Sequence, residues 1–99
     1  MRAFEVDEGS PAEFVARVKR ELDTSGLADY ADLVINGIEL IVQFRWMGSS
    51  ELRYRVTERE SGFRADLDGE RMSVFHAPFR QAFEEKLDKV LAKVGARTV

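Results

Sequence analysis

Cysteine is absent from the 99 residues. Its absence excludes disulfides, thiolate catalysis, iron–sulfur clusters and zinc sites built on cysteine. No apolar stretch approaches the ~20 residues that a membrane-spanning helix needs, and the charged N-terminal sequence lacks the apolar core of a signal peptide. The chain also has no phosphate loop, dinucleotide fingerprint or catalytic-triad motif. We therefore expect a cytoplasmic protein that does not associate with a membrane and needs no cofactor.

An excess of positive charge is also lacking. Lysine and arginine number 15 against 18 aspartates and glutamates, so the formal net charge is -3. This balance argues against a protein that coats nucleic acid without specificity, because such proteins carry an excess of cations. Hydrophobic residues make up 44% and charged residues 33% of the chain, which is typical of a globular protein. The length predicts a single domain over residues 1–99.

Histidine occurs once, as His76 in the stretch SVFHAPFRQAF, residues 73–83. It directly precedes Ala77-Pro78, where a helix pattern begins, and the N-terminus of a helix disfavours a protonated imidazole. No serine stands in a G-x-S-x-G nucleophile elbow, so the sequence offers His76 no partner for catalysis. We expect a structural role for His76 at a corner of the chain and no catalytic residue, which favours a binding protein over an enzyme.

Two helices are predicted, one before and one after the middle of the chain. Ser10 and Pro11 give a strong helix start, and Gly26 gives a stop near residue 25. The second helix is predicted over PFRQAFEEKLDKVLAKVG, residues 78–95, with Gly95 as its end. Each has one apolar stripe at helical spacing. The stripes are Phe14, Val15, Val18 and Leu22 in the first helix, and Phe79, Phe83, Leu87, Val90, Leu91 and Val94 in the second.

Alternating apolar residues between the helices predict an antiparallel meander of four to five strands. Turns are expected at Asn36-Gly37, in MGSSE (47–51), at Glu60-Ser61 and at Asp68-Gly69. The first of these turns pairs Ile35 with Ile38, and the third pairs Val56 with Ala65. The second, centred on Ser49, sets Arg45 opposite Arg53. The fourth adds a further strand, so the sheet edges are expected at 71–75 and at 32–35.

The fold expected from these elements is α+β. The N-terminal and C-terminal helices each have one apolar stripe, and the meander has one mainly apolar face, so a two-layer sandwich with both helices on that face follows. Residues 2–6 alternate as a short strand does, and the sequence leaves open whether they join the sheet.

The polar face of this sheet carries the candidate binding residues. Five arginines are expected to share it around Asp66 as the central acid. Arginine is the side chain best suited to forked recognition of carboxylate or phosphate, although cross-strand acids could neutralise such a face. We refer to this set as the arginine face: Arg45, Arg53, Arg55, Arg64 and Arg71.

Three functions remain open from the sequence. The first is a protein-interaction module, in which the arginine face binds an acidic protein partner and the chain forms a homodimer through a sheet edge or face. The second is nucleic-acid or phosphate-ligand binding by the same face, which is weakly supported because only Phe75 would offer a stacking ring there. The third is a small-ligand binder or an enzyme with its pocket between helices and sheet, using Tyr54, Trp46 and His76.

Overall fold

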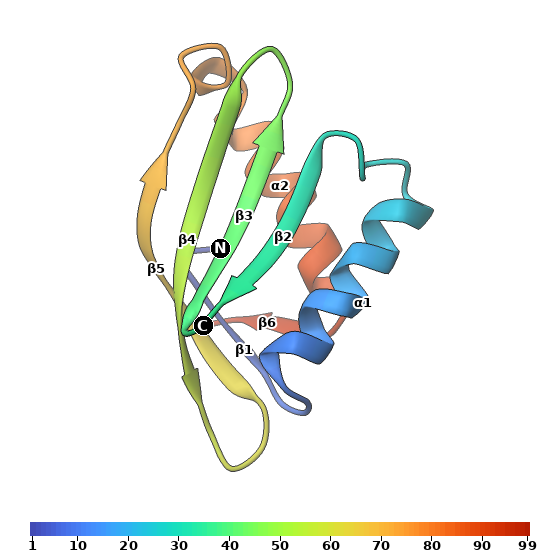
Figure 1. Cartoon of the computed structure of the whole chain (residues 1–99), viewed down its shortest axis with the longest axis vertical. Coiled ribbons are helices and arrows are strands. Elements are labelled where there is room, and N and C mark those ends of the chain that lie inside the picture. Colours follow the sequence, from blue (N-terminus) through green and yellow to red (C-terminus); the bar gives the residue numbers. More distant parts are fainter.

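A computed structural model describes all residues, 1–99, and places two α-helices and six strands in one α+β fold (Figure 1). Neither α-helix combines the length and apolarity that crossing a membrane requires. The elements in chain order are β1 (Ala3–Val6), α1 (Pro11–Thr24), β2 (Ala31–Asn36), β3 (Glu39–Arg45), β4 (Ser49–Glu58), β5 (Phe63–Arg71), the short 3₁₀ helix η1 (Ala77–Phe79), α2 (Arg80–Lys93) and β6 (Ala96–Thr98).

All six strands join one curled antiparallel sheet in the order β2-β3-β4-β5-β1-β6. The antiparallel α+β prediction is therefore confirmed, and the prediction of four to five strands is wrong. Both extra strands come from the chain ends: β1 pairs with β5, and β6 pairs with β1. The edge predicted at 32–35 is correct, whereas the opposite edge is β6 rather than 71–75.

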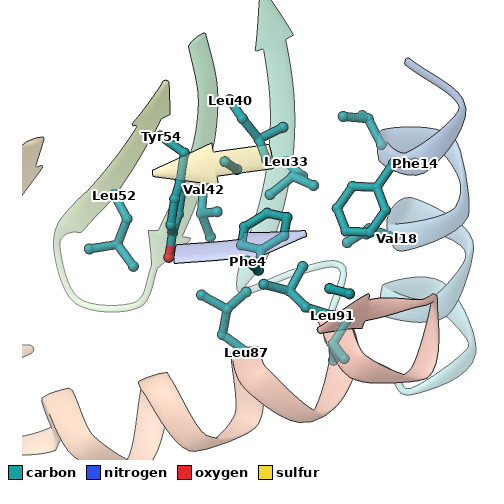
Figure 2. Packing of buried hydrophobic residues seen from close by; sticks show 14 of the residues in the cluster. Phe4, Phe14, Val18, Leu33, Leu40, Val42, Leu52, Tyr54, Leu87 and Leu91 are labelled. Carbon is teal, nitrogen blue, oxygen red and sulfur yellow. The ribbon is translucent and has the colours of Figure 1, made fainter. Parts of the chain in front are cut away.

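The two helices occupy different positions on the concave side of the sheet. In Figure 1, α1 lies along β2 at the sheet edge, while α2 runs behind β2, β3 and β4 towards β6. Both helices face one side of the sheet as predicted, but the sheet curls around them and α1 lies at its β2 edge. Between the helices and the strands lies the core, which Figure 2 shows from close by.

Local sequence explains where α1 begins and ends. Its N-cap is Ser10, whose hydroxyl oxygen accepts a hydrogen bond of 3.1 Å from the Glu13 amide. This bond satisfies one of the free amides of the first turn, and Pro11 occupies a position where no amide is needed. The helix ends at Thr24. Gly26 then adopts a φ of 73°, a left-handed conformation that glycine takes without steric cost.

The β4–β5 register agrees with the prediction, with Val56 opposite Ala65. The β2–β3 register differs by two residues, because Ile35 pairs with Leu40 rather than with Ile38. The two-residue loop is therefore Gly37-Ile38, and Gly37 has a φ of 62° at the first loop position. Glycine is favoured there in type II′ hairpin turns. A shift of two residues keeps every side chain on its predicted face.

The turn predicted at Asp68-Gly69 is wrong. The β5 strand continues through these residues to Arg71, and the pairing with β4 shifts by one residue between Tyr54–Leu67 and Arg53–Gly69. Asp68 is the extra residue of a β-bulge. The first half of β4 pairs with β3 on one side, and β5 pairs with its other side by continuing to Arg71. The separate edge strand predicted at 71–75 therefore does not form.

Nineteen buried hydrophobic residues form one core. Phe4, Phe14 and Phe63 lie at its centre with centroid separations of 5.5 to 6.3 Å, and Tyr54 lies 5.3 Å from Phe4. These edge-on and tilted contacts are the arrangements that aromatic pairs prefer. The strand β1 therefore contributes the middle of the core, although the sequence left its place in the sheet open.

Candidate functional site

The arginine face lies on the convex side of the sheet, but the cross-strand neighbours of its arginines differ from those predicted. Arg45 lies opposite Ser49, and Arg53 lies opposite Ile41. The predicted Arg45–Arg53 pair is therefore wrong, because the β3–β4 connection is centred on Met47 and not on Ser49. The two like charges therefore do not lie directly opposite each other.

Three of the five arginines have acidic neighbours within the chain. Arg55 lies 3.5 Å from Asp68, and Arg71 lies 2.9 Å from Glu51. Arg64 contacts Asp66 at 3.1 Å, and this hydrogen bond raises the pKa of Arg64. Asp66 is thus an acid of the face as predicted, and it forms its ion pair with Arg64 of the same strand.

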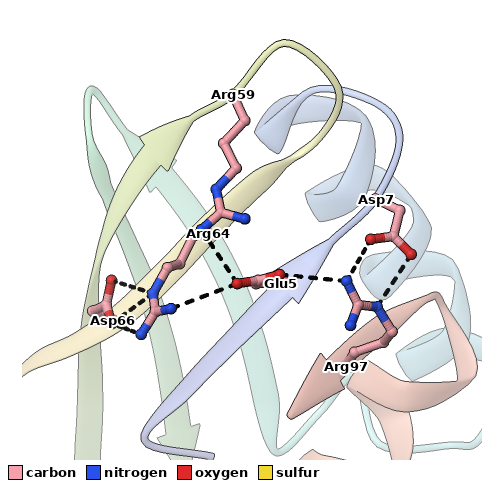
Figure 3. Close-up of polar contacts among 6 residues, drawn as sticks. All are labelled: Glu5, Asp7, Arg59, Arg64, Asp66 and Arg97. Carbon is pink, nitrogen blue, oxygen red and sulfur yellow. Dashed lines mark hydrogen bonds and ion pairs between the residues drawn. The ribbon is translucent and has the colours of Figure 1, made fainter. Parts of the chain in front are cut away.

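Glu5 on β1 extends this pairing into a network (Figure 3). Its carboxylate lies 3.2 Å from Arg59, 3.5 Å from Arg64 and 3.3 Å from Arg97. Arg97 also binds Asp7 at 2.6 Å, and its hydrogen bonds hold the pKa of Asp7 below its usual value. Exposed ion pairs of this kind contribute little stability each, but they occupy the guanidinium groups. Within the arginine face, only Arg45 and Arg53 make no ion pair.

His76 is completely buried and joins three segments. Its Nε2 contacts the backbone carbonyl of Trp46, and its Nδ1 lies 2.6 Å from Ser50 Oγ. A carbonyl can only accept, so a neutral ring with its proton on Nε2 donates to Trp46 and accepts from the Ser50 hydroxyl. Ser50 Oγ in turn accepts a 2.7 Å bond from the Ser73 amide. These contacts match the structural role predicted for His76 at a corner of the chain.

A pocket of about 360 Å³ opens between the helices and the end of β3. All its lining residues except Lys86 are hydrophobic, and they come from both helices and from the sheet. The wall from α1 and the following loop to β2 contains Leu22, Leu27, Tyr30 and Ala31; the β3 side contains Phe44 and Trp46; η1 and α2 contribute Phe79, Ala82, Phe83, Lys86, Leu87 and Val90.

Aromatic packing on one side and short side chains on the other account for this pocket. Phe44 and Phe83 stack with ring centroids 5.3 Å apart. Trp46 stacks on His76 at 6.3 Å and meets Phe79 edge-on at 5.6 Å. Ala31 and Ala82 end at Cβ, so the space between the aromatic groups and α1 stays open. The predicted core position of Phe79 is wrong, since its side chain is 47% exposed beside Trp46 at 41%.

Two exposed loops continue this apolar surface. Met47, in the β3–β4 connection, and Val74 and Phe75, before η1, are large hydrophobic residues with more than half of their surface exposed. The loops lie against each other, because a Cβ on Gly48 would come within 3.6 Å of Phe75. Phe75 therefore belongs to a loop and not to the polar sheet face, which removes the one stacking ring expected there.

Of the three residues predicted as polar groups of a pocket, one lines it. Trp46 forms part of the wall, His76 lies buried behind it, and Tyr54 donates its hydroxyl to the Met1 carbonyl at 2.6 Å. Burial raises the pKa of Tyr54. Tyr30, Ala82 and Lys86 were missed. The spacing of Ala82 and Lys86 from Phe79 and Phe83 places them on the apolar stripe of α2, which was the available indication.

Comparison of the chain with protein-family models, with curated proteins and with solved structures found no match. No three His, Asp or Glu side chains come together in a way that could hold a metal ion. The functional argument therefore depends on the geometry of the pocket and of the arginine face.

Proposed function

We propose that this protein is a binding module for small apolar molecules, which occupy the pocket between the helices and β3. The observation that carries the proposal is the composition of the wall, in which only Lys86 is charged. A concave, mostly apolar cavity with a few polar groups is the usual form of a small-molecule site. The function is thus the third of the alternatives left open by the sequence, in its binding form.

The size of the pocket favours a small molecule over a partner helix. Its volume of about 360 Å³ lies at the lower end of the range for ligand sites, roughly 300–1,000 Å³. A helix bound in a groove needs a channel that accepts side chains over several turns. Here α1, α2 and β3 line one pocket that is partly open to solvent, and Trp46 and Phe79 flank it.

Trp46 provides a direct test, because it is the single tryptophan of the chain and lines the pocket. We expect decanol, added below its solubility limit, to change the emission of Trp46 in a saturable way. The matched variants are Ala82→Phe, which fills the pocket, and Ala92→Phe, which adds the same ring at an exposed position of α2 outside it. Ala82→Phe should abolish the response, and Ala92→Phe should retain it.

Two results would overturn the proposal. One is the absence of any saturable response in the unchanged protein. The other is an equal response in the Ala82→Phe and Ala92→Phe variants, which would place the ligand elsewhere. Circular dichroism of both variants checks that the fold is retained, so that a loss of response in Ala82→Phe reports on the pocket alone.

Binding of an acidic protein partner through the arginine face stays a second proposal. It is favoured by Arg45 and Arg53, which make no ion pair within the chain, and disfavoured by the acids bound to Arg55, Arg64 and Arg71. Arg53→Glu with Arg55→Glu should abolish capture of such a partner while leaving the fold intact. Capture that instead disappears with nuclease or falls steeply with salt would indicate nucleic acid. Sedimentation tests the predicted homodimer.

A further inference from the structure

We infer that the ligand of the pocket is an apolar acid, whose carboxylate binds Lys86 while its apolar body enters the cavity. This inference rests on the proposed function and adds the chemical class of the ligand. The carrying observation is the position of Lys86 on the one stripe of α2 that otherwise builds the apolar wall. The stripe comprises Ala82, Phe83, Lys86, Leu87 and Val90, and Phe79 of η1 precedes it.

The surroundings of Lys86 leave its charge without a neutralising group. Its neighbours at helical spacing are Ala82 and Phe83 before it, and Lys89 and Val90 after it. Residues three and four apart are those that pair on a helix surface, and none of these four carries a carboxylate. Lys89 adds a second positive charge instead. Among the lysines of the chain, only Lys19 and Lys93 make ion pairs.

The acids of α2 are engaged elsewhere. Glu84 binds Arg80 at 3.0 Å, Glu85 accepts a 3.3 Å bond from Gln81, and Asp88 binds the Met1 amine at 2.7 Å. Each carboxylate of the helix therefore has its own donor, and none is within hydrogen-bonding reach of Lys86. The positive charge beside the apolar pocket thus complements an anion supplied by the ligand.

A ligand with an acid group and an apolar body uses both features at once. The apolar body gains free energy in proportion to the surface it removes from water. The carboxylate gains a charge-assisted hydrogen bond from the ammonium group, which is stronger than a bond between neutral groups. A neutral ligand of the same length obtains only the first contribution. Charge should therefore separate decanoate from decanol at this pocket, in a manner that depends on Lys86.

The experiment measures the dissociation constants of decanoate and decanol from Trp46 emission in three proteins. These are the unchanged chain, Lys86→Gln, and Arg53→Gln as a control that removes one positive charge on the opposite face of the sheet. We expect Lys86→Gln to weaken decanoate binding about fivefold, as for a partly exposed ion pair. Decanol binding should change by less than about twofold, and Arg53→Gln should leave both ligands unaffected.

The outcomes separate this inference from the proposed function. Loss of decanoate affinity in Lys86→Gln alone supports the inference, and Lys86→Glu should enlarge that loss. Equal decanoate affinity in the unchanged and Lys86→Gln proteins, with saturable decanol binding, overturns the inference and leaves the pocket function standing. In that case Lys86 only lies along the apolar surface with its amine in water. A response to neither ligand overturns both.

Discussion

The imidazole of His76 accepts a hydrogen bond from Ser50 across 2.6 Å, in a pair that is almost completely inaccessible to solvent. The other ring nitrogen donates to the Trp46 carbonyl, and the Trp46 indole stacks on the imidazole. The pair resembles a catalytic dyad in composition only, because a substrate cannot reach a buried serine. The His76–Ser50 pair instead holds the backbone and the ring of Trp46 in place, and Trp46 forms one wall of the pocket.

Ser50→Ala is expected to lower the free energy of unfolding by about 2 kcal/mol, because it leaves the Ser73 amide and His76 Nδ1 without their buried partner. Urea denaturation measures this change. The variant should also weaken ligand binding, since Trp46 loses part of its support. Labelling of Ser50 by a fluorophosphonate in the folded protein would contradict the structural role.

Two glycines with similar backbone conformations should respond very differently to alanine. Gly62 and Gly37 have φ values of 73° and 62°. A Cβ at Gly62 would lie 1.7 Å from the Val6 carbonyl oxygen, whereas a Cβ at Gly37 would meet nothing within 4 Å. We expect a loss of about 3 kcal/mol or more for Gly62→Ala, and about 1 kcal/mol for Gly37→Ala. Equal urea midpoints in the two variants would refute the β1–β5 packing.

Tyr54→Phe removes the hydroxyl that donates to the Met1 carbonyl and should cost about 1 kcal/mol near neutral pH. Burial raises the pKa of Tyr54 above its usual value of 10.0. A raised pKa in the folded state means that stability is fully present below about pH 10 and falls as the pH rises further. The variant should therefore lose less stability than the unchanged protein above about pH 10. Denaturant titrations at several alkaline pH values measure the difference.

Asp7 provides the corresponding test at acid pH. Its hydrogen bond with Arg97 lowers its pKa, so the folded protein keeps this carboxylate ionised after the unfolded chain has taken up a proton. That contribution to stability is present above about pH 4 and is lost as the pH falls further. Asp7→Asn should make the acid-induced decline in melting temperature shallower. Asp29→Asn, at an exposed loop position, should leave its steepness unchanged.

Local signals in the sequence were sufficient for much of the fold. The start of α1 at Ser10-Pro11 and the Val56–Ala65 register both follow from neighbouring residues, and both are confirmed. Asp68-Gly69 is an error of the same local reasoning. Asp-Gly is the usual composition of a tight turn, but β5 continues past it along the first half of β4, and the dipeptide lies at a bulge. Long-range pairing decided this position, and composition alone does not reveal it.

The pocket was harder to foresee than the arginine face. Alternation within strands placed the arginines on one side, but their ion pairs depend on rotamers and on β1 and β6, which bring Glu5, Asp7 and Arg97 to the network. The pocket depends on how the sheet curls and on where α1 and α2 separate. Ala82 and Lys86 are ordinary residues of an amphipathic helix until that spacing is known.

The most direct measurement is a nitrogen–proton correlation spectrum of the labelled protein during titration with decanoate. The chain has one tryptophan and therefore one indole N–H signal, from Trp46 in the pocket wall. We predict that this signal moves in a saturable way, while the backbone signals of Arg53 and Arg55 on the convex face stay in place. An unmoved indole signal up to about 1 mM decanoate, a limit that corresponds to very weak binding, would contradict the assignment of the pocket as the functional site.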